Sequence, residues 1–267
     1  AAAGTLRDHG DGREVTGPLP PLYAIPTTAG TGSEATRVAV ITDEERGEKM
    51  AIRGEGLLPR AAALDPDLVA TLPAGIAAAT GADALAHAVE AYVSRRATPL
   101  TDHAALAAIE GIGRYLRIFV KSRGDGEAGL GMLLAANLAG QAFTNAGLGL
   151  VHSLAEPFGA RHGVGHGLAC ALYLPVVMTF NLPAAPARFA RIERALTGEE
   201  AGGRSDPAGA VRRLPADLGL PATCRELGIG FRLHREMIAA VPPQFSTSCN
   251  PRQAGPEEVA ALFRAIR

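Results

Sequence analysis

An acid and a histidine stand four residues apart in the stretch GADALAHAVEAY, residues 81–92. The alanine-rich composition predicts a helix, so Asp83 and His87 are expected on one face, one turn apart. Such a pair is either hydrogen-bonded inside a core or bound to a metal ion. The spacing is common on helices and by itself gives weak support to the metal.

Three further histidines follow in GLGLVHSLAEPFGARHGVGHGLACALYLP, residues 147–175: His152, His162 and His166. His152 lies among aliphatic residues, where a lone imidazole is costly to bury. His166 follows a glycine-rich turn at the start of an expected helix, a position that faces a cleft. Singly, each histidine is better explained as a core or capping residue. Jointly, one carboxylate and three imidazoles suit Zn²⁺ or Fe²⁺ in a site with room for a substrate oxygen.

Composition excludes several other classes of protein. Of the 267 residues, 47% are hydrophobic and 20% charged, with a net charge of −1, so a basic surface for nucleic acid or anionic membrane is not expected. The three cysteines are far apart without a CxxC, which fits a reducing cytoplasm and argues against a disulfide frame or a thiolate zinc site. The first residues lack a signal-peptide pattern. The longest apolar run, 167–180, contains Pro175 and is too short to span a bilayer.

The elements that must position these residues change in kind along the chain. Short β-rich segments with Gly and Pro between them predict strands at 21–28, 34–42, 48–52 and 60–66. Alanine- and leucine-rich segments then predict helices at about 74–96, 101–121, 126–145, 147–159, 166–180 and 184–197, and two or more after 205. Prolines at 66, 73, 99, 175, 183 and 221 mostly fall where a helix is expected to start or stop. The fold is therefore predicted to be mainly α, with residues 1–70 forming part of an α/β domain and residues 71–267 an all-helical domain.

Four segments in sequence order resemble the iron-containing (group III) alcohol dehydrogenase family, whose members include lactaldehyde reductase, 1,3-propanediol dehydrogenase and maleylacetate reductase. They are PTTAGTGSE (26–34), GADALAHAVEAYVS (81–94), AGQAFTNAGLGLVHSLAEPFGA (139–160) and HGLACALYLPVVMTFN (166–181). The match runs from about Leu22 to the NPR segment Asn250–Arg252. It implies a dehydroquinate synthase-like architecture, in which a helical metal-binding catalytic domain follows an α/β dinucleotide-binding domain.

The resemblance implies four metal ligands, and they are the residues that their chemistry had singled out: Asp83, His87, His152 and His166. Phe143 is expected to border the substrate pocket, although a core aromatic is the simpler explanation. Glu156 stands where the family often has a second histidine, and it is either a catalytic proton acceptor or a surface charge. Gly165 replaces a proline of the family, so His166 is expected to be held less rigidly.

The same resemblance implies a cofactor loop. Its expected dinucleotide contacts are Thr27, Thr28, Gly30 and Thr31, assisted by Lys49 from the next hairpin. Gly30 and Gly32 would let the backbone approach a phosphate or ribose closely. Taken without the resemblance, the segment is an ordinary turn and Lys49 a solvated charge.

The expected activity is that of a metal-dependent NAD(P) oxidoreductase, which interconverts an alcohol and an aldehyde or ketone by hydride transfer with the substrate oxygen on the metal. Fe²⁺ or Zn²⁺, and NAD or NADP, are the expected cofactors. The resemblance also implies a small alcohol or aldehyde as the only ligand class besides these, a homodimer or larger homo-oligomer, and a cytoplasmic location without nucleic-acid or membrane partners. Distant zinc-dependent cousins such as glycerol dehydrogenase fit the motifs less well.

One departure from the family leaves an alternative open. Family members carry a longer segment before the threonine loop, with a GGGS pyrophosphate-binding turn, and this sequence contains no such segment. The N-terminal half of the dinucleotide-binding domain is therefore expected to be absent. The alternative is a truncated or remnant helical metal-binding domain without independent turnover, because the dinucleotide would lose most of its binding surface.

Overall fold

The computed structural model describes residues 4–10, 13–17, 19–45, 48–198 and 206–267, with only the backbone described at 48 and 49. Six long helices dominate the fold, as the sequence predicts: α2 Ala74–Val93, α3 Pro99–Lys121, α4 Gly126–Ala146, α5 Leu150–His162, α6 His166–Asn181 and α7 Pro186–Thr197. Shorter helices complete the C-terminal part: α8 Pro207–Arg212, α9 Leu214–Leu218, α10 Arg235–Ala240, α11 Phe245–Cys249 and α12 Pro256–Arg264. The mainly α prediction is confirmed.

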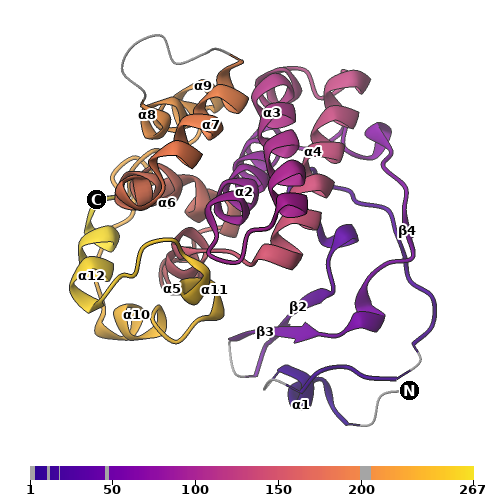
Figure 1. Ribbon diagram of the computed structural model, residues 1–267, viewed down its shortest axis with the longest axis horizontal. Helices are drawn as coiled ribbons and strands as arrows, with labels where there is room; N and C mark the ends of the chain where they lie inside the picture. The colour runs from indigo at the N-terminus through magenta and orange to yellow at the C-terminus, as the bar shows by residue number, and fades with distance from the viewer. Residues whose placement is uncertain (1–3, 11–12, 18, 46–47, 199–205) are drawn as a thin grey trace.

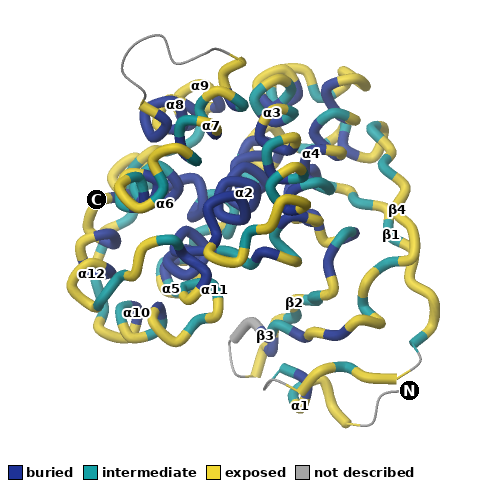
Figure 2. The backbone as a smooth tube through the Cα atoms, in the orientation of Figure 1, coloured by how far each residue is buried: buried dark blue, intermediate teal, exposed yellow. Residues whose placement is uncertain are grey.

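Helix α2 lies at the centre of the helical region and is buried on nearly all sides (Figures 1 and 2). Helices α3, α4 and α6 pack around it. Small residues make this possible: a Cβ added at Gly81 would lie 2.2 Å from the Leu116 side chain of α3. A helix packed this closely cannot turn a polar side chain to solvent, so each buried polar group on α2 needs a partner inside the protein.

Helix α6 closely matches the predicted helix at 166–180. Pro175 lies inside it, an exception among prolines that mostly mark helix ends. Its missing N–H costs one backbone hydrogen bond, but the rest of the helix is held by burial against α2 and α5. The helical segment also continues to Ala184 through a short 3₁₀ turn, Leu182–Ala184, and these 19 residues are long and apolar enough to cross a membrane. Half of the segment is buried inside the fold, as in the core helix of a globular protein.

Before α2 the chain forms a short helix α1, Leu6–Gly10, and two separate two-stranded sheets. Strands β2 Val38–Asp43 and β3 Glu48–Arg53 pair antiparallel, and β1 Tyr23–Ala24 pairs parallel with β4 Ala61–Ala62. The expected strands at 21–28 and 60–66 were too long, since only two residues of each find a partner. Figure 1 shows these elements along one side of the helical region.

The glycine-threonine loop rests on the helices through its glycines. A Cβ at Gly30 would lie 2.6 Å from the Thr80 carbonyl oxygen of α2, and one at Gly32 would lie 2.7 Å from the Ala136 carbonyl oxygen of α4. Gly32 also has φ 60°, a left-handed conformation that favours glycine. The contacts that require glycine here are therefore helix packing contacts. The sequence interpretation had assigned that requirement to a phosphate or ribose.

Candidate metal centre

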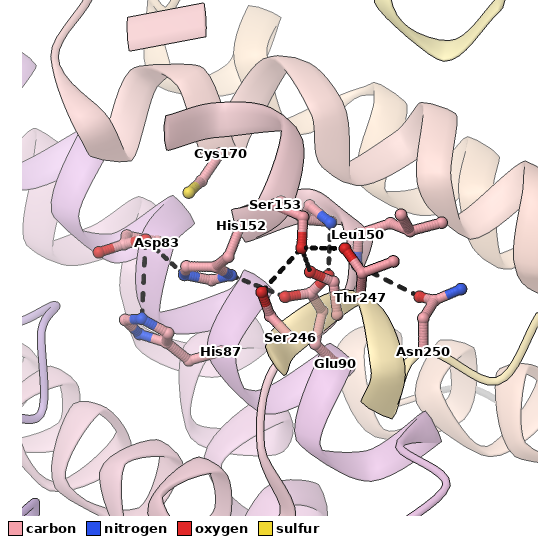
Figure 3. Close-up of polar contacts among 12 residues, drawn as sticks. Asp83, His87, Glu90, Leu150, His152, Ser153, Cys170, Ser246, Thr247 and Asn250 are labelled. Atoms are coloured by element: carbon pink, nitrogen blue, oxygen red, sulfur yellow. Dashed lines mark hydrogen bonds and ion pairs between the residues drawn. The ribbon is translucent and has the colours of Figure 1, made fainter. Parts of the chain in front are cut away.

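Donor atoms of Asp83 and three histidines converge beside the middle of α2. Figure 3 shows Asp83 with two of these histidines, His87 and His152. Asp83 Oδ1 lies 3.6 Å from Nε2 of His152, 3.6 Å from Nε2 of His166 and 3.9 Å from Nε2 of His87. Asp83 and His87 come from one face of α2, as their spacing predicts, while His152 and His166 come from the first turns of α5 and α6. Three helices thus bring together the four residues that the sequence singled out.

The residues present fit a divalent metal ion. Within the described part of the chain, Asp83 Oδ1 and His152 Nε2 are buried and have no hydrogen-bond partner, a costly state that an ion would relieve. A tetrahedral ion about 2.1 Å from each ligand separates the ligands by about 3.4 Å, close to the distances between Asp83 Oδ1 and the histidine nitrogens. A buried carboxylate with imidazole nitrogens suits iron or zinc.

Glu90, one turn further along α2 than His87, holds His152 in place. The Glu90 side chain is 2% exposed, and its Oε2 lies 2.7 Å from His152 Nδ1. If Nδ1 donates the proton of this bond, Nε2 is left with a lone pair directed at Asp83. Glu90 Oε1 also accepts a hydrogen bond of 2.6 Å from the Val151 N–H in the first turn of α5. One carboxylate therefore caps α5 and fixes the ring orientation of a ligand that α5 carries.

Asn250, from the NPR segment near the C-terminus, supports the same helix end. Its Oδ1 accepts from the Leu150 N–H at 3.3 Å and from Asn181 Nδ2 at 2.9 Å, and its Nδ2 donates to Asn181 Oδ1 at 2.8 Å. The first turn of α5 lies close against these groups, because a Cβ at Gly149 would approach Glu90 Oε1 to 2.8 Å. The structure explains why NPR belongs to the motif set: it anchors the helix that presents His152.

The Ser153 hydroxyl anchors α11 to α5 beside this point. Ser153 Oγ lies 2.7 Å from Ser246 Oγ and accepts a hydrogen bond of 2.9 Å from Thr247 Oγ1 (Figure 3). Sequence inspection missed Glu90, Asn250 and this hydroxyl cluster as parts of the site. An acid three residues after His87 inside an otherwise apolar stretch is the signal by which Glu90 could have been found.

His166 reaches the centre because α6 begins directly against α2. Gly167 permits this contact, since a Cβ there would lie 2.4 Å from the Ala79 carbonyl oxygen. Both His152 and His166 stand in the first turn of their helices, where the positive end of the helix dipole favours the Asp83 carboxylate.

The charges at the centre are strongly coupled. Burial by itself would raise the pKa of Asp83, but the neighbouring His87, His152 and His166 bring it well below its usual range. Burial lowers the pKa of His87 to about 4, against the attraction of Asp83. Burial opposes the charge on His152 as well, yet Cys170, Asp83 and Glu90 together raise its pKa above the usual value. The centre thus keeps an ionised carboxylate beside a neutral His87.

Phe143 lies beside the centre, and its place at the border of a substrate pocket stays a prediction. Its ring stacks on the His87 ring with centroids 4.4 Å apart, and His87 stacks in turn on His152 at 4.6 Å. Glu156 lies one turn after His152 on an exposed position of α5, outside the group of converging donor atoms described above. Its catalytic role stays a prediction.

The expected dinucleotide contacts differ in exposure. Thr27 and Thr31 are exposed and Thr28 is half-buried, whereas Gly30 is buried against α2. Thr31 Oγ1 donates to Ser33 Oγ at 3.2 Å within the loop. The Lys49 side chain falls outside the described part of the structure. These contacts stay predictions.

Comparison with known proteins adds an independent result. Residues 77–267 match the family model described as "Fe-containing alcohol dehydrogenase family, C-terminal", and residues 1–66 match "Iron-containing alcohol dehydrogenase". The 1,3-propanediol dehydrogenase of Klebsiella pneumoniae is 43% identical over 270 residues, which cover 98% of this chain and 69% of that protein.

Two solved structures resemble this chain in fold and in sequence. A crystal structure of 1,3-propanediol oxidoreductase superposes with a TM-score of 0.93 at 42% identity, over 99% of this chain and 70% of that one. Sulfoacetaldehyde reductase from Bifidobacterium kashiwanohense, solved in complex with NAD⁺, gives 0.85 at 30% identity, over 97% and 68%. The family implies iron and NAD(H), and the helical part built around Asp83 is its C-terminal domain. The chain belongs to the iron-containing alcohol dehydrogenase family.

Proposed function

We propose that this protein interconverts a small alcohol and its aldehyde or ketone, with a divalent metal held by Asp83, His87, His152 and His166 and with NAD(H) as the hydride carrier. The observation that carries the proposal is the convergence of four donor atoms on one buried point with two of them lacking a hydrogen-bond partner in the described chain. Fe²⁺ is the first choice because of the family, and Zn²⁺ is chemically compatible.

The metal, when bound, supplies Lewis-acid polarisation of the substrate oxygen. The residues of this chain supply charge, orient a ligand and exclude water at the centre. Asp83 contributes negative charge from the buried side, and Glu90 fixes the orientation of His152 through the 2.7 Å contact. Phe143 covers one face of His87 and excludes water from that side. The apolar Phe143 ring beside His87 favours a small uncharged substrate.

The dinucleotide is proposed to lie along the glycine-threonine loop, with the hydroxyls of Thr27, Thr28 and Thr31 as hydrogen-bond partners and Lys49 as a cationic one. Support comes from the exposure of Thr27 and Thr31 and from the seating of Gly30 against α2 beside the metal centre. NAD is preferred to NADP in this proposal because the sulfoacetaldehyde reductase structure contains NAD⁺. The dinucleotide itself supplies the hydride chemistry.

The substrate class follows the relatives in outline. The names of similar proteins, methanol dehydrogenase, 1,3-propanediol dehydrogenase and lactaldehyde reductase, concern small alcohols and aldehydes, so a short-chain primary alcohol or its aldehyde is proposed here. We further propose a cytoplasmic homodimer or larger homo-oligomer without nucleic-acid or membrane partners. The reduced, buried state of all three cysteines and the net charge of −1 support this setting.

Titration of the metal-loaded chain with NADH and NADPH, followed by assays with short aldehydes, tests the proposal. Saturable NADH binding in the micromolar range and aldehyde-dependent NADH oxidation are expected. Thr27→Ala should weaken NADH binding about 3- to 10-fold, the loss of one hydrogen bond, and leave metal content unchanged. Stoichiometric metal without any dinucleotide binding would reject the proposal and favour the remnant metal-binding domain.

A further inference from the structure

One donor atom at the metal centre has no role in the proposed function. Cys170 stands on α6 one turn after His166, is fully buried, and points its sulfur toward Asp83 and His152 (Figure 3). Its Sγ lies 3.7 Å from His166 Nε2. The sequence interpretation took the cysteines as a sign of a reducing compartment and as evidence against a thiolate zinc site, and it gave Cys170 no function.

The geometry around Cys170 is that of a ligand position. One donor atom each from Asp83, His152, His166 and Cys170 lie within 4.8 Å of one another. For an ion about 2.1 Å from nitrogen and 2.3 Å from sulfur, tetrahedral ligands of these two kinds lie about 3.6 Å apart. The separation of Cys170 Sγ and His166 Nε2 matches this value.

The surroundings of this thiol differ from those of the other two. Cys224 and Cys249 are also buried, but the described structure does not group them with potential metal ligands. The Cys170 side chain is fully buried at the centre. Beside it stand Asp83 Oδ1 and His152 Nε2, two buried atoms without a hydrogen-bond partner in the described chain. A metal ion placed to satisfy those two atoms also has the sulfur within reach.

We propose that Cys170 Sγ is a further protein ligand of the metal in the substrate-free protein, together with Asp83, His152 and His166. As the sulfur–metal bond forms, the thiol proton passes to solvent. His87, with Nε2 3.9 Å from Asp83 Oδ1, is then a fifth donor. A thiolate ligand favours the thiophilic ions Zn²⁺ and Co²⁺ over Mn²⁺, which prefers oxygen. This inference rests on the proposed metal centre.

Cobalt substitution tests the ligand directly. The metal-free full chain is loaded with Co²⁺ alone, and its absorption is recorded in the near ultraviolet, where thiolate-to-cobalt charge transfer appears. The band is expected in the wild type and in Cys249→Ser, a matched buried cysteine elsewhere. It is expected to vanish in Cys170→Ser and Cys170→Ala while Co²⁺ stays bound. The wild-type spectrum decides the question even if a variant does not fold.

Each outcome separates the two proposals. Bound Co²⁺ without the band in the wild type, or a band that persists in Cys170→Ser, overturns the role of Cys170 and leaves the metal centre standing. Absence of Co²⁺ binding overturns both. Competition with a chelator gives a second readout: Cys170→Ser is expected to lower Zn²⁺ affinity about tenfold or more and Mn²⁺ affinity much less. Equal losses for the two ions would contradict the inference.

Discussion

The metal centre and the glycine-threonine loop both contact α2, but they differ in how far their polar side chains are buried and held in place by other residues. At the centre, Asp83, His87 and His152 are each no more than 5% exposed, and their helices are fixed by partners such as Glu90. In the loop, Thr27 and Thr31 are exposed, and the contacts that need glycine go to helices. Three helices of the chain bring the donor atoms of the centre together, whereas the loop leaves the hydroxyls of Thr27 and Thr31 exposed.

The difference in burial indicates which part of the protein each binding function depends on. Buried donor atoms have no access to other partners, so helix packing fixes their arrangement as a group. Exposed hydroxyls form hydrogen bonds with water or with a bound ligand, and helix packing does not fix those partners. We therefore expect metal binding to depend on residues 74–181 and dinucleotide binding to depend on the loop, with separate responses to mutation.

Asp83→Asn is expected to have the largest effect. The substitution keeps the side-chain shape but removes the charge that faces three histidines. Loss of a residue that only supports a ligand lowers metal affinity about 10–100-fold. Loss of the Asp83 charge is expected to lower it further. Calorimetric titration with Zn²⁺ measures it, and Glu110→Gln on the exposed face of α3 is the control. Wild-type metal affinity in Asp83→Asn would remove Asp83 from the ligand set.

Glu90→Gln tests the support of His152. The amide can still accept from the Val151 N–H, but its NH₂ group cannot accept the His152 Nδ1 proton, so metal affinity is expected to drop about 10–100-fold. Glu90→Ala removes the cap of α5 as well and should cost about 1 kcal/mol of additional unfolding free energy. If both variants bind metal as tightly as the wild type, the carboxylate does not position the ring.

Gly32→Ala addresses the seating of the loop on α4. The positive φ and the Ala136 carbonyl oxygen both oppose a Cβ, whereas Gly219 has φ 68° with open space around it. Each substitution costs about 1–2 kcal/mol for the backbone conformation, and Gly32→Ala should cost more because of the contact. Urea unfolding of both variants gives the comparison. Equal losses would show that the loop is not packed closely on α4.

The two ends of α5 carry histidines in opposite situations. The His152 ring is bound by Glu90. His162 Nε2, in contrast, is buried without a hydrogen-bond partner in the described chain, and its ring packs against Phe158 and Phe231. Burial, His234 and Arg161 lower the pKa of His162, so the unfolded chain binds the proton more readily. Stability from this group is present above about pH 6.5 and is lost as pH falls below it. The melting temperature of His162→Phe should decline less between pH 7 and 5 than that of the wild type, and parallel curves would contradict this.

Much of this arrangement could be predicted from sequence, for reasons tied to particular residues. The four-residue spacing of Asp83 and His87 puts both on one helical face, and alanine-rich composition located the long helices to within a few residues. The predicted helix over 166–180 runs through Pro175, as the observed helix does, because tertiary packing outweighs the loss of one hydrogen bond. The partners Glu90 and Asn250 were missed because sequence separations of 61 and 100 residues, to Val151 and Leu150, carry no local signal.

Metal analysis of the purified wild type beside His152→Ala tests the central claim most directly. The exchange removes one ligand and leaves the α5 cap, since Glu90 still binds the Val151 N–H. Stoichiometric iron or zinc is expected in the wild type. His152→Ala, with an unchanged circular dichroism spectrum, should contain almost none. Equal metal content in the two proteins would contradict a centre built from Asp83, His87, His152 and His166.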